Sequence, residues 1–267
     1  MSKARTSWSD HLWQVAGVTT ALAGWWLIAS IVGPSRLPTP SQQAVALVEV
    51  VWFSPVLAAR PGGSGDLAGD LLYTVSRCVT GGLVGGALGI GIGLAMGWSN
   101  RLRSLLELPI EVFRSIPPLA AIPFFLMWFG PAALTQFAVL VFYASLRLVI
   151  NTVEAIRNVP PVVSQYAQTL GATPGQVYRT VILPGIVPEL VGGMRVAFAT
   201  SWGLEIVAEL LGSPAGIGKL FAYLVPMLRP DLIIALVAWV TVVAVGLDQF
   251  LLLPLVRMST RWVPQVA

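Results

Sequence analysis

Long uncharged segments separate short polar ones along this chain of 267 residues. Residues 11–35, 78–100, 115–146 and 232–247 contain no Asp, Glu, Lys or Arg and consist mainly of apolar side chains. A helix of about 20 apolar residues spans the hydrocarbon core of a bilayer, which is about 30 Å thick. The pattern therefore predicts several helices that cross a membrane.

The uncharged run 115–146 is too long for one helix across such a core. It contains Gly130-Pro131, and proline interrupts the hydrogen bonds of a helix. We therefore expect two helices joined by a tight hairpin on the outer side of the membrane. The complete prediction is six spanning helices, at residues 13–33, 71–98, 106–129, 132–150, 183–211 and 232–256.

A polar stretch rich in proline and glycine, residues 33–70, separates the first two predicted spans. Its segment 37–41 can cap a short amphipathic helix that runs to Phe53, which we expect on the outer surface, and residues 59–65 are typical of a flexible loop. A seventh span over residues 44–59 is the alternative. Glu49, Pro55 and the reversed topology that this span would impose argue against it.

Composition supports a membrane protein. Hydrophobic residues make up 56% of the chain, charged residues 10%, and the mean hydropathy is +0.79. Soluble domains carry about 25% charged residues, so a soluble fold is excluded. The first apolar run lacks the small-residue cleavage site of a secretory signal, and we predict a retained span. The lone Cys78 allows no intrachain disulfide and is expected to be a packing residue.

Basic residues predict the orientation. If the N-terminus is cytoplasmic, nine basic residues fall on the cytoplasmic side and four on the outer side, which agrees with the positive-inside rule. The cytoplasmic set is Lys3, Arg5, Arg101, Arg103, Arg147, Arg157, Arg179, Arg257 and Arg261, and the outer set is Arg36, Arg60, Lys219 and Arg229. Both termini should then be cytoplasmic. The net charge of +4 reflects this topology and does not require a nucleic-acid partner.

The polar segment 158–182 predicts a helical hairpin on the cytoplasmic side. Pro160 and Pro161 suit the first turn of a helix, with Asn158 as a candidate cap, and Gly171 suits its C-terminal end. The sequence TPGQ at 173–176 has the pattern of a capping box that starts a second helix. A surface hairpin without a binding partner is the simpler alternative.

The second predicted span carries a glycine at every fourth position from Gly81 to Gly97. Consecutive members of such a row lie on one side of a helix and leave a groove that another helix can enter closely. We favour this packing role over the alternative, a pore lined by bare backbone.

The hairpin resembles the signature of the membrane subunits of bacterial ABC importers, which is a Glu-Ala-Ala triplet, a glycine four residues on and a hydrophobic-x-Leu-Pro sequence. Gln165-Tyr166-Ala167 occupies the triplet and departs from it at two positions, while Gly171 and VILP at 181–184 match. Further runs resemble the permeases of the nitrate/sulfonate/taurine importer family. They are RSIPPLAAIP at 114–123, WFG at 128–130, IVAE at 206–209 and GIG at 216–218.

This resemblance covers roughly residues 70–255 and implies an all-α polytopic membrane protein with the type I ABC importer (MetI-like) permease fold. The resemblance implies a transmembrane domain at 70–255, and the hydropathy and charge patterns add an N-terminal helix and outer segment at 1–69 and a cytoplasmic tail at 256–267. The implied partners are a second permease copy, two cytoplasmic ATPases that bind ATP and Mg, and an extracytoplasmic substrate-binding protein. The implied ATPase-coupling residues are Gln165, Tyr166, Ala167, Gly171, Ala172, Thr173, Pro174, Leu183 and Pro184.

Ionisable and proline residues within spans supply candidates for the translocation path, because charges in a membrane are costly unless they face water or a partner. The candidates are Arg77, Arg114, Pro117, Pro118, Glu205 and Glu209. For Arg114 the alternative is a side chain that snorkels to water. For the prolines it is a static kink, and for Glu209 it is a solvated helix end.

No enzyme site is evident from the sequence. One histidine and one cysteine cannot build a His/Cys metal cluster, and no Walker-type phosphate loop occurs, so a separate ATPase must hydrolyse ATP. We therefore expect a permease of the bacterial inner membrane that binds no cofactor and moves a small anion such as taurine, an alkanesulfonate, nitrate, bicarbonate or an aromatic carboxylate. The alternatives are a permease for a thiamine-precursor-type solute, an uncoupled channel or secondary carrier, and a structural membrane scaffold.

Overall fold

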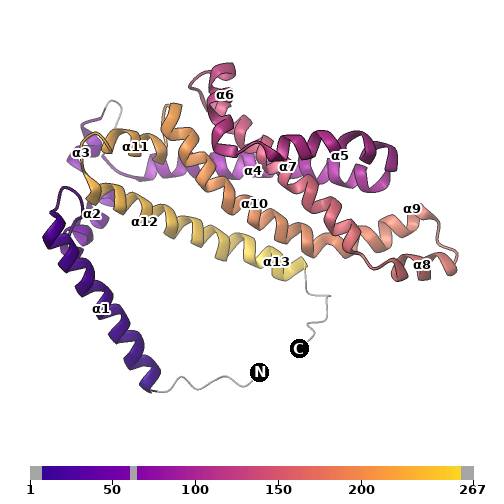
Figure 1. Ribbon diagram of the computed structural model, residues 1–267, viewed down its shortest axis with the longest axis horizontal. Coiled ribbons are helices and arrows are strands. Elements are labelled where there is room, and N and C mark those ends of the chain that lie inside the picture. The colour runs from indigo at the N-terminus through magenta and orange to yellow at the C-terminus, as the bar shows by residue number, and fades with distance from the viewer. Residues whose placement is uncertain (1–7, 61–64, 260–267) are drawn as a thin grey trace. The chain divides into compact units, whose positions relative to one another are not determined.

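The computed structural model describes residues 8–60 and 65–259, and all regular elements within these ranges are helices (Figure 1). The predicted all-α class is confirmed. Lys3, Arg5 and Arg261, which entered the orientation count, lie outside the described residues, as do 61–64 of the predicted loop and the end of the predicted tail. The described chain forms two compact units, Met1–Ala68 with Phe221–Val240, and Gly69–Leu220 with Thr241–Ala267.

The first unit contains α1 (Trp8–Val32), α2 (Pro40–Trp52) and the four-residue α3 (Pro55–Ala58). Two indole groups link its segments, because Trp25 Nε1 donates to the Pro38 carbonyl at 3.0 Å and Trp239 Nε1 donates to the Leu47 carbonyl at 2.9 Å. Most large side chains of α1, such as Trp13 and Ile31, are exposed. Such a surface suits contact with lipid or with another chain.

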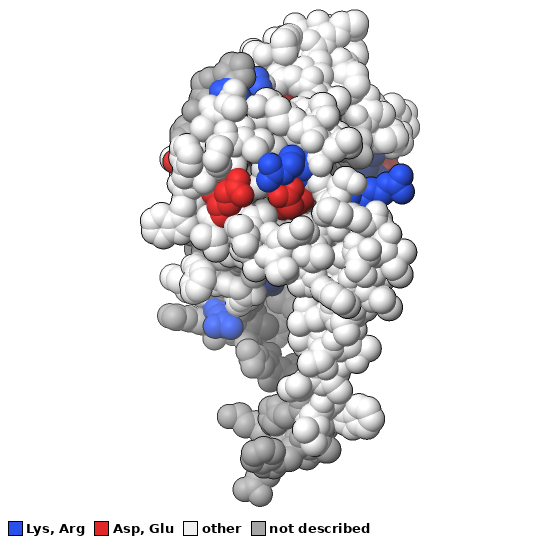
Figure 2. All heavy atoms as spheres, turned by 90° about the vertical axis from the view of Figure 1, so that its left-hand side faces the viewer, with Lys and Arg blue, Asp and Glu red and all other residues white. Residues whose placement is uncertain are grey.

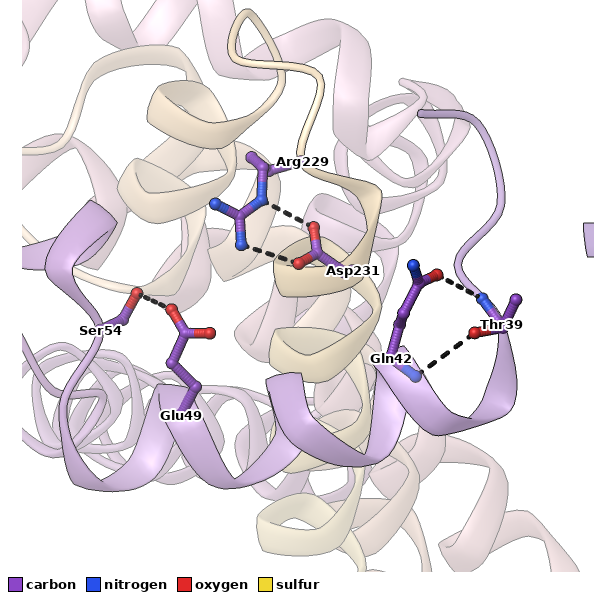
Figure 3. Close-up of polar contacts among 6 residues, drawn as sticks. All are labelled: Thr39, Gln42, Glu49, Ser54, Arg229 and Asp231. Atoms are coloured by element: carbon purple, nitrogen blue, oxygen red, sulfur yellow. Dashed lines mark hydrogen bonds and ion pairs between the residues drawn. The ribbon is translucent and has the colours of Figure 1, made fainter. Parts of the chain in front are cut away.

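Helix α2 is the short helix predicted after residue 41, and its start follows from a capping box at Thr39 and Gln42 (Figure 3). It has 13 residues and gives way to extended backbone at Phe53. A spanning helix over residues 44–59 is therefore wrong. Ser54 donates to Glu49 at 2.7 Å, and Arg229 forms two hydrogen bonds with Asp231 at 3.0 and 2.8 Å.

The second unit contains α4 (Ala68–Trp98), α5 (Asn100–Ser115), α6 (Pro118–Phe129), α7 (Ala133–Asn158) and α10 (Leu183–Gly212). It also contains the start of α11 (Ile217–Leu224) and the end of α12 (Pro230–Leu247). The π-helix η2 (Asp248–Leu252) and α13 (Leu253–Ser259) continue α12. Helices α7 and α10 form its most extensive interface.

The glycine row of α4 packs against α7, as predicted. A Cβ atom added at Gly85 would lie 2.7 Å from the Val141 carbonyl oxygen, and one at Gly93 would lie 2.6 Å from Thr152 Cβ. At Gly89 it would meet the carbonyl oxygen of Ser145 and lie 2.9 Å from Leu148 Cβ. No side chain larger than hydrogen fits there unless the two helices move apart.

The third predicted span needs correction, because residues 106–129 do not form one straight helix. Helix α5 already begins at Asn100, where Ser99 caps it, and it meets α6 at a bend of 97°. The bend follows from Pro117, at the N-cap of α6, and Pro118, which begins it. Five helices of the described chain are long and apolar enough to cross a membrane, or six if the bent pair counts as one span.

Helix α7 is longer than predicted, since it runs to Asn158 and not to residue 150. Arg147, which the orientation count places on the cytoplasmic side, is therefore not close to the end of the helix. Arg147 lies 11 residues, or about 16 Å, before the end of the helix.

Charged side chains are otherwise sparse: Figure 2 shows a face on which uncharged surface predominates over a few basic and acidic groups.

Candidate functional site

The segment 158–182 forms the predicted hairpin from α8 (Pro161–Thr169), α9 (Pro174–Val177) and the π-helix η1 (Tyr178–Ile182). Gly171 adopts φ +88° at the corner, and its N–H donates to the Gln168 carbonyl at 2.9 Å. Thr173 and Gln176 form the predicted capping box. Asn158 is not the cap of α8: it ends α7 and donates to Glu189 at 2.9 Å, while Pro160 holds the N-cap position.

An apolar row lies on the exposed side of this hairpin. Val162, Tyr166 and Leu170 follow one another at intervals of four, and 66%, 67% and 72% of their respective surfaces are exposed. Residues four apart in a helix share a face. Large apolar side chains so exposed outside the spanning segments indicate a surface that another protein covers.

The base of the hairpin is fixed to α4 by residues that the sequence patterns did not identify. The Tyr178 hydroxyl donates to the Leu94 carbonyl at 2.7 Å, and its ring packs edge to face on Trp98 at 5.0 Å. Leu183 and Pro184 then start α10 directly after η1. The base of the hairpin is therefore in contact with α4 and continuous with α10.

Two of the path candidates, Glu205 and Glu209, are fully buried in α10. The Glu209 carboxylate accepts from Thr74 at 2.8 Å and from the Gly218 N–H at 2.8 Å, and thus connects α10 to α4 and to the start of α11. Asp70 accepts from the Gly216 N–H at 2.9 Å. The IVAE and GIG runs of the sequence therefore meet in one polar network, in which Glu209 accepts from the Gly218 N–H and Thr74 accepts from the Ile217 N–H at the start of α11.

Glu205 lies one turn before Glu209, and neither of its carboxyl oxygens has a hydrogen bond of normal geometry. Arg77 is near enough for a Coulombic interaction with it. The Arg77 guanidinium lies 5.2 Å from the centre of the Tyr73 ring, and its Nε is buried without a hydrogen bond. The role of Arg77, Glu205 and Glu209 in the translocation path stays a prediction.

A cavity of about 980 Å³ lies among α5, α6, α7 and α10. Arg114 and Pro118 line it, whereas Pro117, Arg77, Glu205 and Glu209 do not. Arg114 is exposed and forms an ion pair with Glu111. The polar side chains of the lining are Arg114, Tyr143, Arg147, Asn151, Glu154, Glu189, Thr200 and Ser201.

The sequence patterns missed the α7 wall of this cavity, which carries Tyr143, Arg147 and Asn151 at intervals of four residues. These three residues were missed because the predicted helix stopped at residue 150, which left Arg147 near its end. A spacing of four between polar residues near an apolar run was the available signal.

An ion pair joins α10 to η2. Both oxygens of Asp248 in η2 accept hydrogen bonds from Arg195. Arg195 therefore pairs with Asp248, whereas Glu189 of the same helix accepts from Asn158. Among the described residues, no group of three or more His, Cys, Asp and Glu side chains could hold a metal ion.

Comparison with known proteins agrees with this architecture. Residues 87–258 match the family described as binding-protein-dependent transport system inner membrane component. The taurine transport system permease protein TauC of Escherichia coli is 28% identical over 88% of this chain and 84% of its own length. The nitrate import permease protein NrtB of Synechococcus elongatus is 30% identical over 74% of this chain and 70% of its own.

A similar fold occurs in a solved structure of the MetNI methionine ABC transporter in an inward-facing conformation. The TM-score is 0.59 at 22% identity, over 73% of this chain and 96% of the other. The family match covers more than half of the chain, and the fold agrees with it. The chain therefore belongs to the binding-protein-dependent transport system inner membrane components, and it is the permease of an ABC importer.

Proposed function

We propose that this permease couples to a cytoplasmic ABC ATPase through the hairpin 158–182 and imports a small anion that an extracytoplasmic binding protein delivers. The observation that carries the coupling proposal is the exposed apolar row of Val162, Tyr166 and Leu170 on a hairpin fixed to α4. An ATPase groove that covers this row gains apolar burial at about 25 cal/mol per Å².

The predicted coupling residues have roles consistent with this. Gly171, Ala172, Thr173 and Pro174 form the corner and the start of α9, and Leu183 and Pro184 start α10. Exposed Gln165 and Tyr166 belong to α8, as does Ala167, whose carbonyl accepts from the Ala172 N–H at 3.1 Å. Closure of the ATPase pair on ATP and Mg would move the hairpins, and the contacts of Tyr178 would transmit this motion to the spanning helices.

The transport domain, 70–255, is proposed to work beside a second copy of the chain. The polar lining of the α7 and α10 cavity supports this, because polar side chains in a membrane must face water or protein and not lipid. Both termini are proposed to be cytoplasmic. Without Arg147 the basic residues still divide eight to four in favour of that orientation.

The proposed substrate class rests on the relatives, which are named for taurine and nitrate. Both solutes carry a monovalent oxyanion group. A solute of the thiamine-precursor type is the second candidate for this permease.

The hairpin proposal is tested by co-purification of the permease with its ATPase. Leu170→Glu places a charge in the apolar row and should remove the ATPase from the detergent-solubilised complex while the permease stays in the membrane. The matched control is Gln168→Glu, an exposed polar residue of the same helix, which should retain the ATPase. Retention of the ATPase by Leu170→Glu would reject this surface as the docking site.

A further inference from the structure

Arg147 is an ionised side chain in the interior of a spanning helix. Helix α7 has 26 residues, and Arg147 lies 14 residues after its start and 11 before its end. At about 1.5 Å per residue, the side chain leaves the helix some 16 Å from the nearer end. A permanently charged group within an apolar helix of this kind is costly unless it faces water, protein or a ligand.

This arginine faces the cavity and has no ion pair among the described residues. Two other charged side chains of the lining do have partners: Arg114 forms an ion pair with Glu111, and Glu189 accepts a hydrogen bond from Asn158. Glu154 lies seven residues beyond Arg147, about 10 Å along the helix axis. Arg147 is therefore the unneutralised positive charge of this wall.

Two unsatisfied polar atoms flank it on the same wall. The Tyr143 hydroxyl, one turn before Arg147, and the Asn151 side-chain oxygen, one turn after it, are both buried without a hydrogen-bond partner. Buried polar atoms without partners cost about 1 to 3 kcal/mol each, and they are rare in native structures unless a ligand or water satisfies them. Each step of four residues turns about 40° around the helix, so the three side chains form one continuous row.

The opposite helix makes room for this row. A Cβ atom at Gly193 of α10 would overlap the Asn151 amide, so only glycine lets α10 approach that side chain. Gly192 and Gly193 both line the cavity beside it. The amide thus has a fixed place against α10 and is not a side chain that happens to point into open space.

We infer that Arg147, with Tyr143 and Asn151, forms a binding subsite for a monovalent oxyanion in this cavity. A guanidinium offers several N–H donors in a planar fork, which match two oxygens of a sulfonate, nitrate or carboxylate group. The Tyr143 hydroxyl, which lacks a partner, supplies a further donor. Asn151 can contribute only its amide nitrogen, because its side-chain oxygen is an acceptor and cannot bind an anion. The subsite rests on the proposed function, since it names the part of the permease that recognises the imported anion.

The test compares two thiol reagents of opposite charge on the permease–ATPase complex in proteoliposomes. Cys78 is replaced by alanine, and Asn151→Cys places one thiol a helical turn from Arg147. The anionic sulfonatoethyl methanethiosulfonate should react faster, relative to the cationic trimethylammonioethyl reagent, when Arg147 is present. Replacing Arg147 by glutamine should lower this rate ratio about tenfold or more, because the nearby unit charge acts on the two reagents in opposite directions.

Two further variants separate charge from structure. Arg147→Lys keeps the charge and should keep the ratio. Arg157→Gln is the matched control: it removes an arginine from the same helix, but one that pairs with Glu107 at 2.9 Å, and should leave the ratio within about twofold. If the ratio does not respond to Arg147→Gln, or if the thiol introduced by Asn151→Cys is unreactive in both nucleotide-free and ATP-trapped states, the subsite is refuted.

Uptake separates this inference from the proposed function. If Arg147 binds the imported anion, Arg147→Gln should raise KM for taurine or nitrate while the ATPase still co-purifies, and Arg157→Gln should not. A complex that imports neither anion would count against the proposed substrate class, yet the thiol-reagent ratio would still decide whether the oxyanion subsite exists.

Discussion

The two sides of α7 differ in what they meet. One side, which includes Val141, Ser145, Leu148 and Thr152, packs against the α4 glycines with backbone contacts that admit no side chain. The other side, which includes Tyr143, Arg147 and Asn151, lines a cavity of about 980 Å³. At about 100° per residue the centres of these two sets lie about 130° apart around the helix. The same helix thus combines a close-packed seam with a polar wall.

This difference shows how α7 can be fixed to α4 on one side and still border an open cavity on the other. The α4 side of the seam consists of glycines and has no side chain that can adjust, so we expect α4 and α7 to move as one body. The cavity side has space and unsatisfied polar atoms, so its solvation and contacts can change during transport. We expect motion of the hairpin to reach this pair through Tyr178 of η1, whose hydroxyl donates to the Leu94 carbonyl of α4.

The largest expected effect comes from breaking the seam. Gly89→Leu would force the Ser145 carbonyl and the Leu148 side chain away, and we expect a loss of about 3 kcal/mol in stability, with little assembled complex. Gly91→Leu is the control, because nothing lies within 4 Å of a Cβ atom there. Thermal unfolding of the detergent-solubilised complexes measures both. Equal stability of the two variants would show that the seam is not close-packed.

A smaller loss of stability is expected at the polar network of α10. Glu209→Gln removes one of the two acceptor oxygens that serve Thr74 and Gly218, and the cost should be about 1 to 3 kcal/mol. Glu205→Gln, one turn earlier, removes no hydrogen bond of normal geometry and should leave the melting temperature closer to that of the native protein. A reversed order of the two melting temperatures would contradict the assigned hydrogen bonds.

Coupling should fail when the hairpin corner is strained. Gly171 has φ +88°, and a β-branched residue there costs about 1 to 2 kcal/mol. We expect Gly171→Val to reduce uptake and transport-linked ATP hydrolysis roughly tenfold while insertion persists. Gly175→Ala, where the added carbon would lie 3.7 Å from Trp98, should couple normally. Full coupling in Gly171→Val would show that the conformation of the corner is not needed for coupling to the ATPase.

The smallest effect concerns Glu205 as a path residue. Glu205→Gln removes an ionisable group near Arg77 without changing its size, and we expect a few-fold change in uptake with unchanged ATPase co-purification. The same uptake as the native complex would leave Glu205 a structural residue.

Much of this arrangement follows from the sequence. The glycine row, the helix cap within residues 37–41, the Thr173 capping box and the corner at Gly171 are local features, and the structure confirms each one. The end of α7 could not be predicted in this way. By hydropathy alone, Arg147 and Glu154 resemble the polar end of a spanning helix. Hydropathy does not reveal that both side chains line a cavity.

The bend between α5 and α6 shows a second limit. Prolines at 117 and 118 predict an interruption, but its angle of 97° depends on packing against α7. Contacts between distant segments, such as Tyr178 with Leu94 and Glu209 with Thr74, join residues more than 80 positions apart. No periodicity within one helix carries that information.

The two-sided α7 is tested most directly by a scan of single cysteines along residues 141–154 in a Cys78→Ala background, with the complex in proteoliposomes and a membrane-impermeant thiol reagent. We expect labelling at 143, 147, 151 and 154, at least in one nucleotide state, and none at 141, 145, 148 and 152 in any state. Labelling of the second set at rates similar to the first, or protection of both sets in every state, would contradict the account.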